Sequence, residues 1–413
     1  MRTYMKSSVI GVAIMAWLLM TGSVVADEPV LKKITVNEIE REYAVYIPSH
    51  PTKTKADGII VCLHGFNRNM YDFFNQYDIT DVANSLNLAI VAPQALPEQN
   101  GNLYDIIDNF AYLISDQLSL NSVWGCGLGV RVALGPLNLI NEELNEKLDD
   151  VNFINRAIDE VVADYDLPEE NLFLLGTSMG GYMTYQYALI SGERLSGIIS
   201  IAGSMGLKIK NKDYSTKIPV CDFHSLTDEV VPYTGSYMQN LMQISLAMPM
   251  VDVLNYWAQT NATGAPYTEQ VLNYPPSNDI TVEKVTYPDP ENEVIHYRFD
   301  GAPHSYFFKK DNGDCMDHVE EIMQFVQSHL VETQSSNPVI AGQKALFYPN
   351  PVYDRAYFRA TSGIVTVYDI TGRIVYSQSI TDGQADFSPL KSGIYLIHIQ
   401  SGGKTQIGKL IKK

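Results

Sequence analysis

A serine flanked by glycines lies in the middle of the chain, directly after an apolar run. The segment Gly176-Thr177-Ser178-Met179-Gly180 follows Leu172–Leu175, which predicts a buried strand, and precedes Tyr182–Ile190, which predicts a helix. A serine on a tight strand–turn–helix is typical of a nucleophile elbow. Gly176 and Gly180 fit this turn because a Cβ at either position would collide with the neighbouring strand or helix. The structural alternative is a glycine-rich turn with a surface serine.

Two later segments supply an acid and a base. Asp228 follows the strand predicted over Val220–His224, and His304 lies in a loop after the strand predicted over Val294–Phe299. With Ser178, they occur in the order nucleophile, acid, base. In this chemistry the imidazole removes the serine proton as attack begins, and the carboxylate holds the imidazole in the right tautomer. The pattern predicts acyl transfer through an acyl-enzyme.

Other acids and histidines compete for these roles. Glu229 is the nearest alternative acid, whereas Asp222 lies inside the predicted strand and is less suited. Asp228 also fits a plain turn residue, and a loop histidine is common on protein surfaces. Structural positions are expected for five further histidines: His50, His296, His318, His329 and His398.

The apolar run Gly58–Leu63 ends in His64-Gly65-Phe66. In hydrolases with an elbow, this loop and the residue after the nucleophile supply two backbone N–H groups to the oxyanion hole. We therefore expect the amides of Phe66 and Met179 to form it, each worth about 3–4 kcal/mol of barrier. We expect His64 itself to be a structural turn residue and not a base.

The region from Arg41 to Leu330 resembles the extracellular esterases grouped with polyhydroxybutyrate depolymerases and feruloyl esterases. The resemblance rests on Arg41–Pro48, Leu63–Gly65, Trp124–Gly127, Asp149–Ile154 and His224–Tyr233. It implies an α/β-hydrolase fold with a mostly parallel sheet, and a serine carboxylic-ester hydrolase without metal or cofactor. The implied substrates are feruloyl or acetyl esters of polysaccharides, or polyesters.

The sequence departs from that family at two positions. Ser225 stands where glycine is usual, and Ser305 follows His304 where the family often has tryptophan, which leaves the substrate open. Two other functions remain as alternatives. Prolyl-type oligopeptidases share the Ser-Met-Gly-Gly elbow, although no propeller-sized region precedes the catalytic part here. A non-catalytic surface binding protein on a hydrolase scaffold is the other.

The two ends of the chain predict export. Residues 1–26 combine a basic start, a short apolar run and Val24-Val25-Ala26, which predicts a secretory signal peptide. A hydrolase domain is expected over 27–332 and a linker over 333–345. Residues 346–413 resemble the C-terminal sorting domain of type IX secretion cargo, a small β-sandwich, on Tyr348–Pro351, Ser392–Tyr395 and the lysine-rich end. A carbohydrate-binding sandwich is the alternative. The resemblance implies the secretion machinery as a partner and a secreted or cell-surface location.

Charge and cysteines add further limits. The formal net charge of −18 disfavours nucleic acid and favours uncharged esters. Cys62 and Cys221 fall in predicted core strands and are expected as buried thiols, whereas Cys126 and Cys315 are candidates for a disulfide after export. The Met- and Leu-rich run over 237–258 predicts a pair of packing helices rather than a substrate lid.

Overall fold

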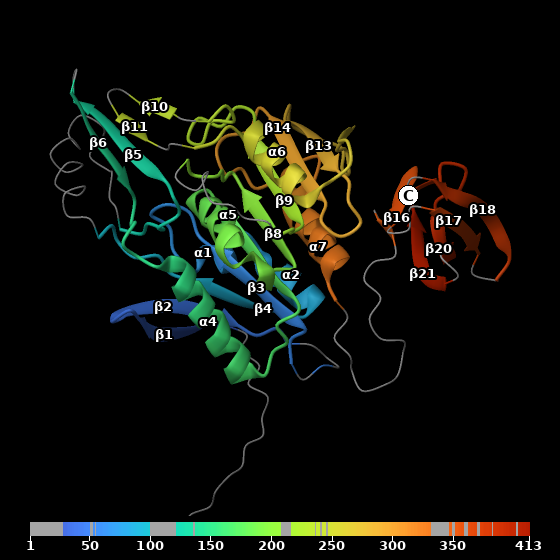
Figure 1. The fold of residues 1–413 in the computed structure, drawn as a ribbon, viewed down its shortest axis with the longest axis horizontal. Helices are drawn as coiled ribbons and strands as arrows, with labels where there is room; N and C mark the ends of the chain where they lie inside the picture. The colour runs from blue at the N-terminus through green and yellow to red at the C-terminus, as the bar shows by residue number, and fades with distance from the viewer. Residues whose placement is uncertain are drawn as a thin grey trace, which may run out of the picture.

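The structure is a computed structural model of the chain (Figure 1). It describes residues 28–49, 53, 55–99, 121–134, 137–207, 216–235, 237–239, 242–244, 247–331, 347–348, 352–358, 362–369, 372–381, 383–401 and 404–413. The expected signal peptide over 1–26 and the expected linker over 333–345 lie outside these residues. Within the described residues, none of the helices has the length and apolar character needed to cross a membrane.

A ten-stranded sheet forms the centre of the larger part, in the order β1-β2-β4-β3-β7-β8-β9-β14-β13-β12. The six strands from β4 to β14 run parallel, and the strands outside them are antiparallel. The strands are β1 (Val30–Val36), β2 (Ile39–Tyr46), β3 (Gly58–Leu63), β4 (Leu88–Pro93), β7 (Leu172–Thr177), β8 (Gly197–Ile201), β9 (Val220–Ser225), β12 (Tyr267–Gln270), β13 (Thr281–Tyr287) and β14 (Val294–Asp300). The predicted α/β-hydrolase fold with a mostly parallel sheet is confirmed.

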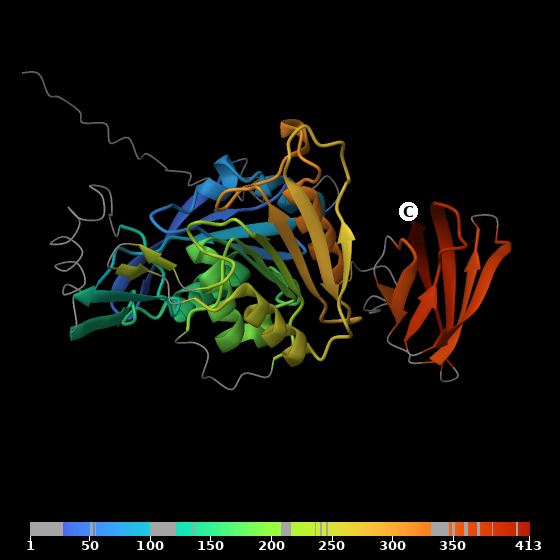
Figure 2. The same cartoon turned by 90° about the horizontal axis from the view of Figure 1, so that it is seen from above.

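Helices cover both faces of this sheet (Figure 2). They are α1 (Asp72–Asn75), α2 (Ile79–Leu86), α4 (Asp150–Tyr165), α5 (Met179–Ser191), α6 (Met250–Asn261) and α7 (His318–His329). Because side chains alternate along a strand, Val61 packs into the apolar cluster under α4, α5 and α6, whereas Cys62 packs into the cluster under α1, α2 and α7. Every residue of β3, β4, β7, β8 and β9 is buried, as expected for parallel strands covered on both faces.

The parallel strands bring distant loops together. Since β3, β7, β9 and β14 run in one direction, the loops that follow them leave from the same edge of the sheet. Ligand sites of open α/β sheets lie at this edge, beyond the carboxyl ends of the strands. The loops after these strands carry Phe66, Ser178, Asp228 and His304.

A second, four-stranded sheet was missed from the sequence. It has the order β10-β11-β5-β6, with β5 (Gly129–Leu134), β6 (Leu137–Glu143), β10 (Tyr237–Gln239) and β11 (Met242–Ile244). The helix pair predicted over 237–258 is therefore wrong in its first half, and only α6 is helical. The backbone of β11 pairs with β5, more than 100 residues earlier in the chain, so local composition could not reveal it.

The C-terminal part is one antiparallel sheet of seven strands, in the order β15-β16-β19-β18-β17-β20-β21. Its strands are β15 (Phe347–Tyr348), β16 (Arg355–Phe358), β17 (Ser362–Tyr368), β18 (Ile374–Thr381), β19 (Gln384–Asp386), β20 (Gly393–Ser401) and β21 (Lys404–Lys412). A bridge between Val352 and Lys412 joins its two ends, and the sheet encloses its own apolar core. The expected small sandwich is thus present, and it is built from a single sheet that curls onto itself.

The cysteine predictions had mixed outcomes. Cys62 and Cys221 are free, buried thiols in β3 and β9, as predicted. The expected bridge between Cys126 and Cys315 is wrong, because both are free. Cys126 belongs to the apolar cluster on one face of the sheet and Cys315 to the cluster on the other, so the sheet separates the two thiols.

Two buried histidines and a mostly buried one predict a pH-dependent stability. Burial lowers the pKa of His64 to about 4, of His329 to about 4 and of His318 to about 3. The unfolded chain, with ordinary values near 6.5, therefore binds more protons than the folded one at acidic pH. We expect the unfolding free energy to be at its full value above about pH 6.5 and to fall towards pH 4, with a slope of up to about 4 kcal/mol per pH unit for three protons.

Urea unfolding followed by tryptophan fluorescence measures this slope for the hydrolase part. Among the three tryptophans, Trp124 and Trp257 lie in the described core of that part, and Trp17 lies within residues 1–26. The H318N variant should lose about a third of the slope. A free energy that stays constant between pH 6.5 and 4.5 would contradict the prediction.

Candidate active site

Ser178 occupies a strained turn between β7 and α5. Its backbone has φ 53° and ψ −118°, a conformation that a residue with a side chain rarely adopts. An added Cβ at Gly176 would lie 2.1 Å from Gly180 O, and one at Gly180 would lie 1.8 Å from Leu63 O. Both glycines are therefore required by close backbone approach. The turn leaves the Ser178 side chain partly exposed, directly beyond the end of β7.

A continuous line of hydrogen bonds joins the three side chains predicted from the sequence. His304 Nε2 lies 2.8 Å from Ser178 Oγ, and His304 Nδ1 lies 2.7 Å from Asp228 Oδ2. An ionised carboxylate can only accept, so Nδ1 carries the proton and Nε2 accepts from the serine hydroxyl. Ser178 precedes His304 by 126 residues in the chain, and Asp228 precedes it by 76. The arrangement can remove the serine proton during attack on a carbonyl carbon.

The carboxyl of Asp228 is fully buried and fixed at both oxygens. Its Oδ1 accepts hydrogen bonds from the amides of Val230 and Val231, at 2.8 and 2.7 Å. Burial alone would raise the pKa of this carboxyl. The hydrogen bond and charge interaction with His304, the Val231 amide and nearby His224 outweigh burial and hold the pKa below its ordinary value. Asp228 is therefore ionised throughout the neutral range.

Ser225, one of the two positions that depart from the pattern expected from the sequence, connects the acid loop with the base loop. Its hydroxyl donates to Ala302 O at 2.6 Å, and the Thr227 hydroxyl donates to the same carbonyl at 3.2 Å. Ala302 lies two residues before His304. The serine thus adds a side-chain contact between the loops of Asp228 and His304 that a glycine could not make.

The loop after β3 lies against the nucleophile. An added Cβ at Gly65 would lie 3.3 Å from Ser178 Cβ. Nearby amides are occupied, since Asn67 N donates to Ser122 O and Gly181 N donates to Ser178 O. Within the part of the chain that the structure describes, the amides of Phe66 and Met179 donate to no protein acceptor. That these two amides form the oxyanion hole stays a prediction from the sequence.

The side chains of His64 and Trp124 hold this loop in place. The His64 ring is buried, with Nδ1 2.8 Å from Gly65 O, while Nε2 accepts from Ala95 N at 3.1 Å. The Trp124 indole donates to His64 O at 2.9 Å, and its ring lies 5.1 Å from the His64 ring. The loop thus has a side-chain anchor at each of its first two carbonyls.

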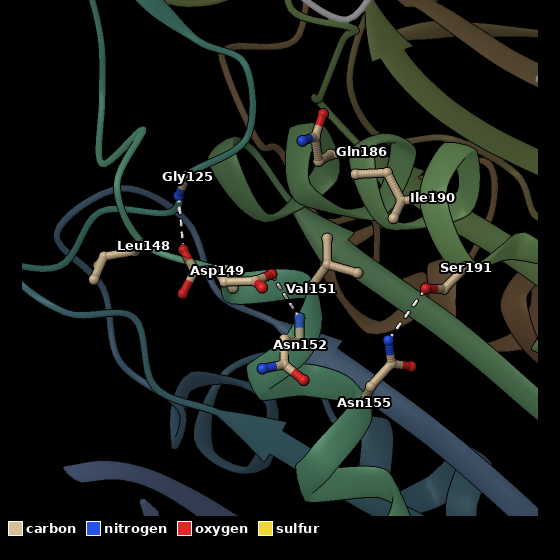
Figure 3. Close-up of a pocket in the computed structure, with 10 residues that line it drawn as sticks. Gly125, Leu148, Asp149, Val151, Asn152, Asn155, Gln186, Ile190 and Ser191 are labelled. Carbon is tan, nitrogen blue, oxygen red and sulfur yellow. Dashed lines mark hydrogen bonds between the residues drawn. The ribbon is translucent and has the colours of Figure 1, made fainter. Parts of the chain in front are cut away.

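This anchor extends to the start of α4. Gly125 N, next to Trp124, donates to Asp150 Oδ2 at 2.7 Å, the dashed line at Gly125 in Figure 3. Asp150 Oδ1 accepts from Arg41 at 2.7 Å. Both charged side chains are almost completely buried. The sequence segments Arg41–Pro48, Trp124–Gly127 and Asp149–Ile154 therefore meet in one network. Their joint role was not visible from the sequence.

A cavity of about 330 Å³ lies beside this network, between the start of α4 and the outer turns of α5 (Figure 3). Its lining includes Gly125, Asn155, Gln186 and Ile190, but none of Ser178, Asp228 and His304. The Ser178 hydroxyl is therefore outside this cavity, at the edge of the sheet.

Comparisons with known proteins agree with the fold. Residues 139–253 match the phospholipase/carboxylesterase family, and residues 346–413 match the secretion system C-terminal sorting domain. No curated protein matches the chain. With the mostly parallel sheet, the first match defines a carboxylic-ester hydrolase of the α/β-hydrolase class. The second match adds that this hydrolase is a secreted or cell-surface protein carrying a type IX sorting domain.

Solved structures with a similar fold include three hydrolases. Acetyl xylan esterase from Aspergillus awamori is 13% identical over 72% of this chain and 99% of its own, with a TM-score of 0.46. The Bacillus cereus carboxylesterase is 11% identical over 70% and 94%, with a TM-score of 0.41. The acylaminoacyl peptidase of Pyrococcus horikoshii is 15% identical over 75% and 43%, with a TM-score of 0.43. At these identities and scores, the likeness assigns neither a substrate nor site residues.

Proposed function

We propose that this protein is a secreted serine esterase in which Ser178 attacks the ester carbonyl. The hydrogen-bonded line from Ser178 through His304 to Asp228 carries the proposal. His304 accepts the serine proton and returns it to the leaving alcohol, so that an acyl-serine forms. Water then repeats the cycle and releases the acid. Asp228 keeps the imidazole oriented and stabilises its charged form.

The amides of Phe66 and Met179 form the oxyanion hole in this proposal. Each is free of protein acceptors among the described residues, and Gly65 lies against Ser178 Cβ. Donors fixed before the reaction stabilise the negative oxygen of the tetrahedral intermediate without reorganisation. Gly176 and Gly180 serve by allowing the tight turn that presents Met179.

The substrate that we propose is an uncharged ester, either a feruloyl or acetyl ester of a polysaccharide or a polyester. The net charge of −18 disfavours polyanions such as nucleic acid. Partly exposed aromatic side chains come from the loops around the triad, namely Phe66, Tyr77 and Phe307, and the last two pack 5.1 Å apart. Such a surface suits an apolar or aromatic acyl group. Export through the periplasm would bring the enzyme to polymers outside the cell.

A panel of substrates tests this proposal. The purified full chain is assayed with short-chain p-nitrophenyl esters, methyl ferulate, acetylated xylan and a peptide anilide. Ester turnover without anilide cleavage supports an esterase, and the preferred ester narrows the choice of acyl group in the natural substrate. Anilide cleavage at a higher kcat/KM would identify a peptidase instead. Absence of turnover and of labelling by a fluorophosphonate would favour a binding protein on a hydrolase scaffold.

The anchor of the oxyanion loop gives a separate prediction. In the W124F variant, His64 O loses its buried donor, whereas an aromatic ring is kept at position 124. Because a loosened loop holds Phe66 N less well, we expect kcat to fall about tenfold with KM little changed, a loss of about 1–2 kcal/mol of barrier stabilisation. Steady-state kinetics with a p-nitrophenyl ester measures both constants.

Trp257 provides the matched control. It is also fully buried, but its indole Nε1 has no partner among the described residues. Phenylalanine keeps a ring against Tyr185, whose centroid lies 6.2 Å from that of Trp257, so W257F removes no hydrogen bond and should leave kcat unchanged, whatever it does to stability. Equal losses of kcat in W124F and W257F would show that the effect comes from core packing and not from the loop.

A further inference from the structure

A second histidine–aspartate pair lies in the core beneath the proposed triad. His296 Nδ1 lies 2.8 Å from Asp222 Oδ2, and both side chains are at most 1% exposed. The two residues are direct partners in the register between the parallel strands β9 and β14. An ionisable pair in this position costs desolvation energy that two apolar residues would not. Neither residue reaches the reacting atoms.

Two tyrosines extend this pair into a chain of four side chains. Tyr185 Oη donates to Asp222 Oδ1 at 2.9 Å, and Tyr233 Oη lies 2.9 Å from His296 Nε2. Since the carboxylate accepts from Tyr185 and from His296 Nδ1–H, His296 Nε2 is free to accept from Tyr233. Burial and the charge of Asp222 raise the pKa of Tyr185 well above its ordinary value and that of Tyr233 to about 12, so both hydroxyls keep their protons.

The members of this chain come from the elements that carry the proposed triad. Tyr185 lies on α5, which starts directly after Ser178. Asp222 and His296 lie on β9 and β14, whose following loops hold Asp228 and His304. Tyr233 lies at the end of the acid loop, five residues after Asp228. One line of hydrogen bonds therefore joins the three elements whose relative position sets the geometry of the triad.

Other hydrogen bonds among the described residues also hold the acid loop at this end. His224 Nε2 lies 2.7 Å from Val231 O, and Met250 N donates to Tyr233 O at 3.0 Å. The ring of Tyr233 packs edge-on against His224 at 5.8 Å. Within the described part of the chain, the Tyr233 hydroxyl connects this loop with the buried pair.

We propose that Tyr185, Asp222, His296 and Tyr233 are positioning residues that hold the acid loop and the base strand in register with the elbow helix. This inference rests on the proposed function, because it assumes that Ser178, Asp228 and His304 react together. Loss of an end hydroxyl leaves the substrate surface intact but loosens Asp228 relative to His304. The effect should therefore appear in kcat and not in KM.

The test compares three Tyr→Phe variants of the full chain. Y185F and Y233F each remove one end of the hydrogen-bond line. Y187F is the matched control, because Tyr187 lies on the same helix as Tyr185 and is also fully buried. Its hydroxyl donates to Asn155 Oδ1 at 2.6 Å, and Asn155 does not belong to the hydrogen-bond line. Each variant loses one tyrosine hydroxyl and the hydrogen bond that it makes to Asp222, His296 or Asn155.

We expect Y185F and Y233F to lower kcat for a p-nitrophenyl ester about 10-fold or more, with KM within about twofold of the wild type. Their rate of labelling by a fluorophosphonate should fall in parallel, since labelling needs the same serine and base. Y187F should retain both rates. Thermal unfolding of the three variants checks that they are folded to a similar extent.

Two results would overturn the inference. Unchanged kcat and labelling rate in Y185F and Y233F would show that the four linked residues serve only the structure of the core. Equal losses in Y187F would assign the effect to packing of α5. Failure of the proposed function is distinguishable from both, because a wild-type protein that is neither labelled at Ser178 nor active on any ester shows no rate for the variants to change.

Discussion

Ser178→Ala should abolish ester hydrolysis, with kcat at least about 10⁴-fold below that of the wild type. The hydroxyl is the one group in the proposed mechanism that forms a bond to the substrate, so no neighbour can replace it. Alanine fits the same turn, since Ser178 makes its tight contacts through the backbone, with Ser178 N donating to Ile201 O at 2.7 Å. The measurement is kcat on a p-nitrophenyl ester under saturating substrate.

Stability and a second serine serve as controls for this variant. The unfolding free energy of S178A should equal that of the wild type, because the φ of 53° is retained and only one hydroxyl is lost. Ser196 lies on the surface, where its hydroxyl donates to Glu170 O, and S196A should keep full activity. A folded S178A protein with more than about 1% of wild-type kcat would exclude Ser178 as the nucleophile.

The central strands and the elbow could be predicted because their signals are local. Runs such as Leu172–Leu175 are apolar without alternation, which is typical of a parallel strand covered on both faces. The antiparallel strands β12 and β13 at the edge were missed. In β12 the sequence Tyr-Thr-Glu-Gln is half exposed, and such a short polar segment has no signal distinct from a loop.

Properties that depend on three-dimensional pairing could not be predicted. The disulfide prediction failed because the position of a cysteine in a loop does not reveal which face of the sheet it packs against. The pairing of β11 with β5 depends on backbone contacts between segments far apart in the chain. Register, similarly, decides that Asp222 faces His296, 74 residues away.

One sequence signal did point to the buried chain. The strand β9 has the sequence Val-Cys-Asp-Phe-His-Ser, and all six residues are buried. Three polar side chains in a fully buried strand require internal partners, because an unpaired buried polar group is costly. Asp222 pairs with Tyr185 and His296, and Ser225 donates to Ala302 O. Polar residues within a predicted core strand are thus a guide to hidden networks even when their partners are unknown.

Asp228→Asn is expected to lower kcat about 10⁴-fold while leaving the fold and KM nearly unchanged. The two amides of Val230 and Val231 require an acceptor at Oδ1, so the asparagine oxygen takes that position. Its NH₂ group then faces His304 Nδ1, which must become an acceptor. The ring proton moves to Nε2 and points at Ser178 Oγ, where it can no longer accept the serine proton.

Glu229 offers the matched control on the same loop. It was the closest competing acid in the sequence, but its side chain is exposed, whereas that of Asp228 is fully buried against His304. E229Q should therefore retain wild-type kcat, since the substitution removes one surface charge and no contact with the imidazole. A large loss in E229Q together with an active D228N variant would reverse the assignment. Because the lowered pKa of Asp228 keeps it ionised at neutral pH, the difference between the two variants should persist from pH 6 to pH 9.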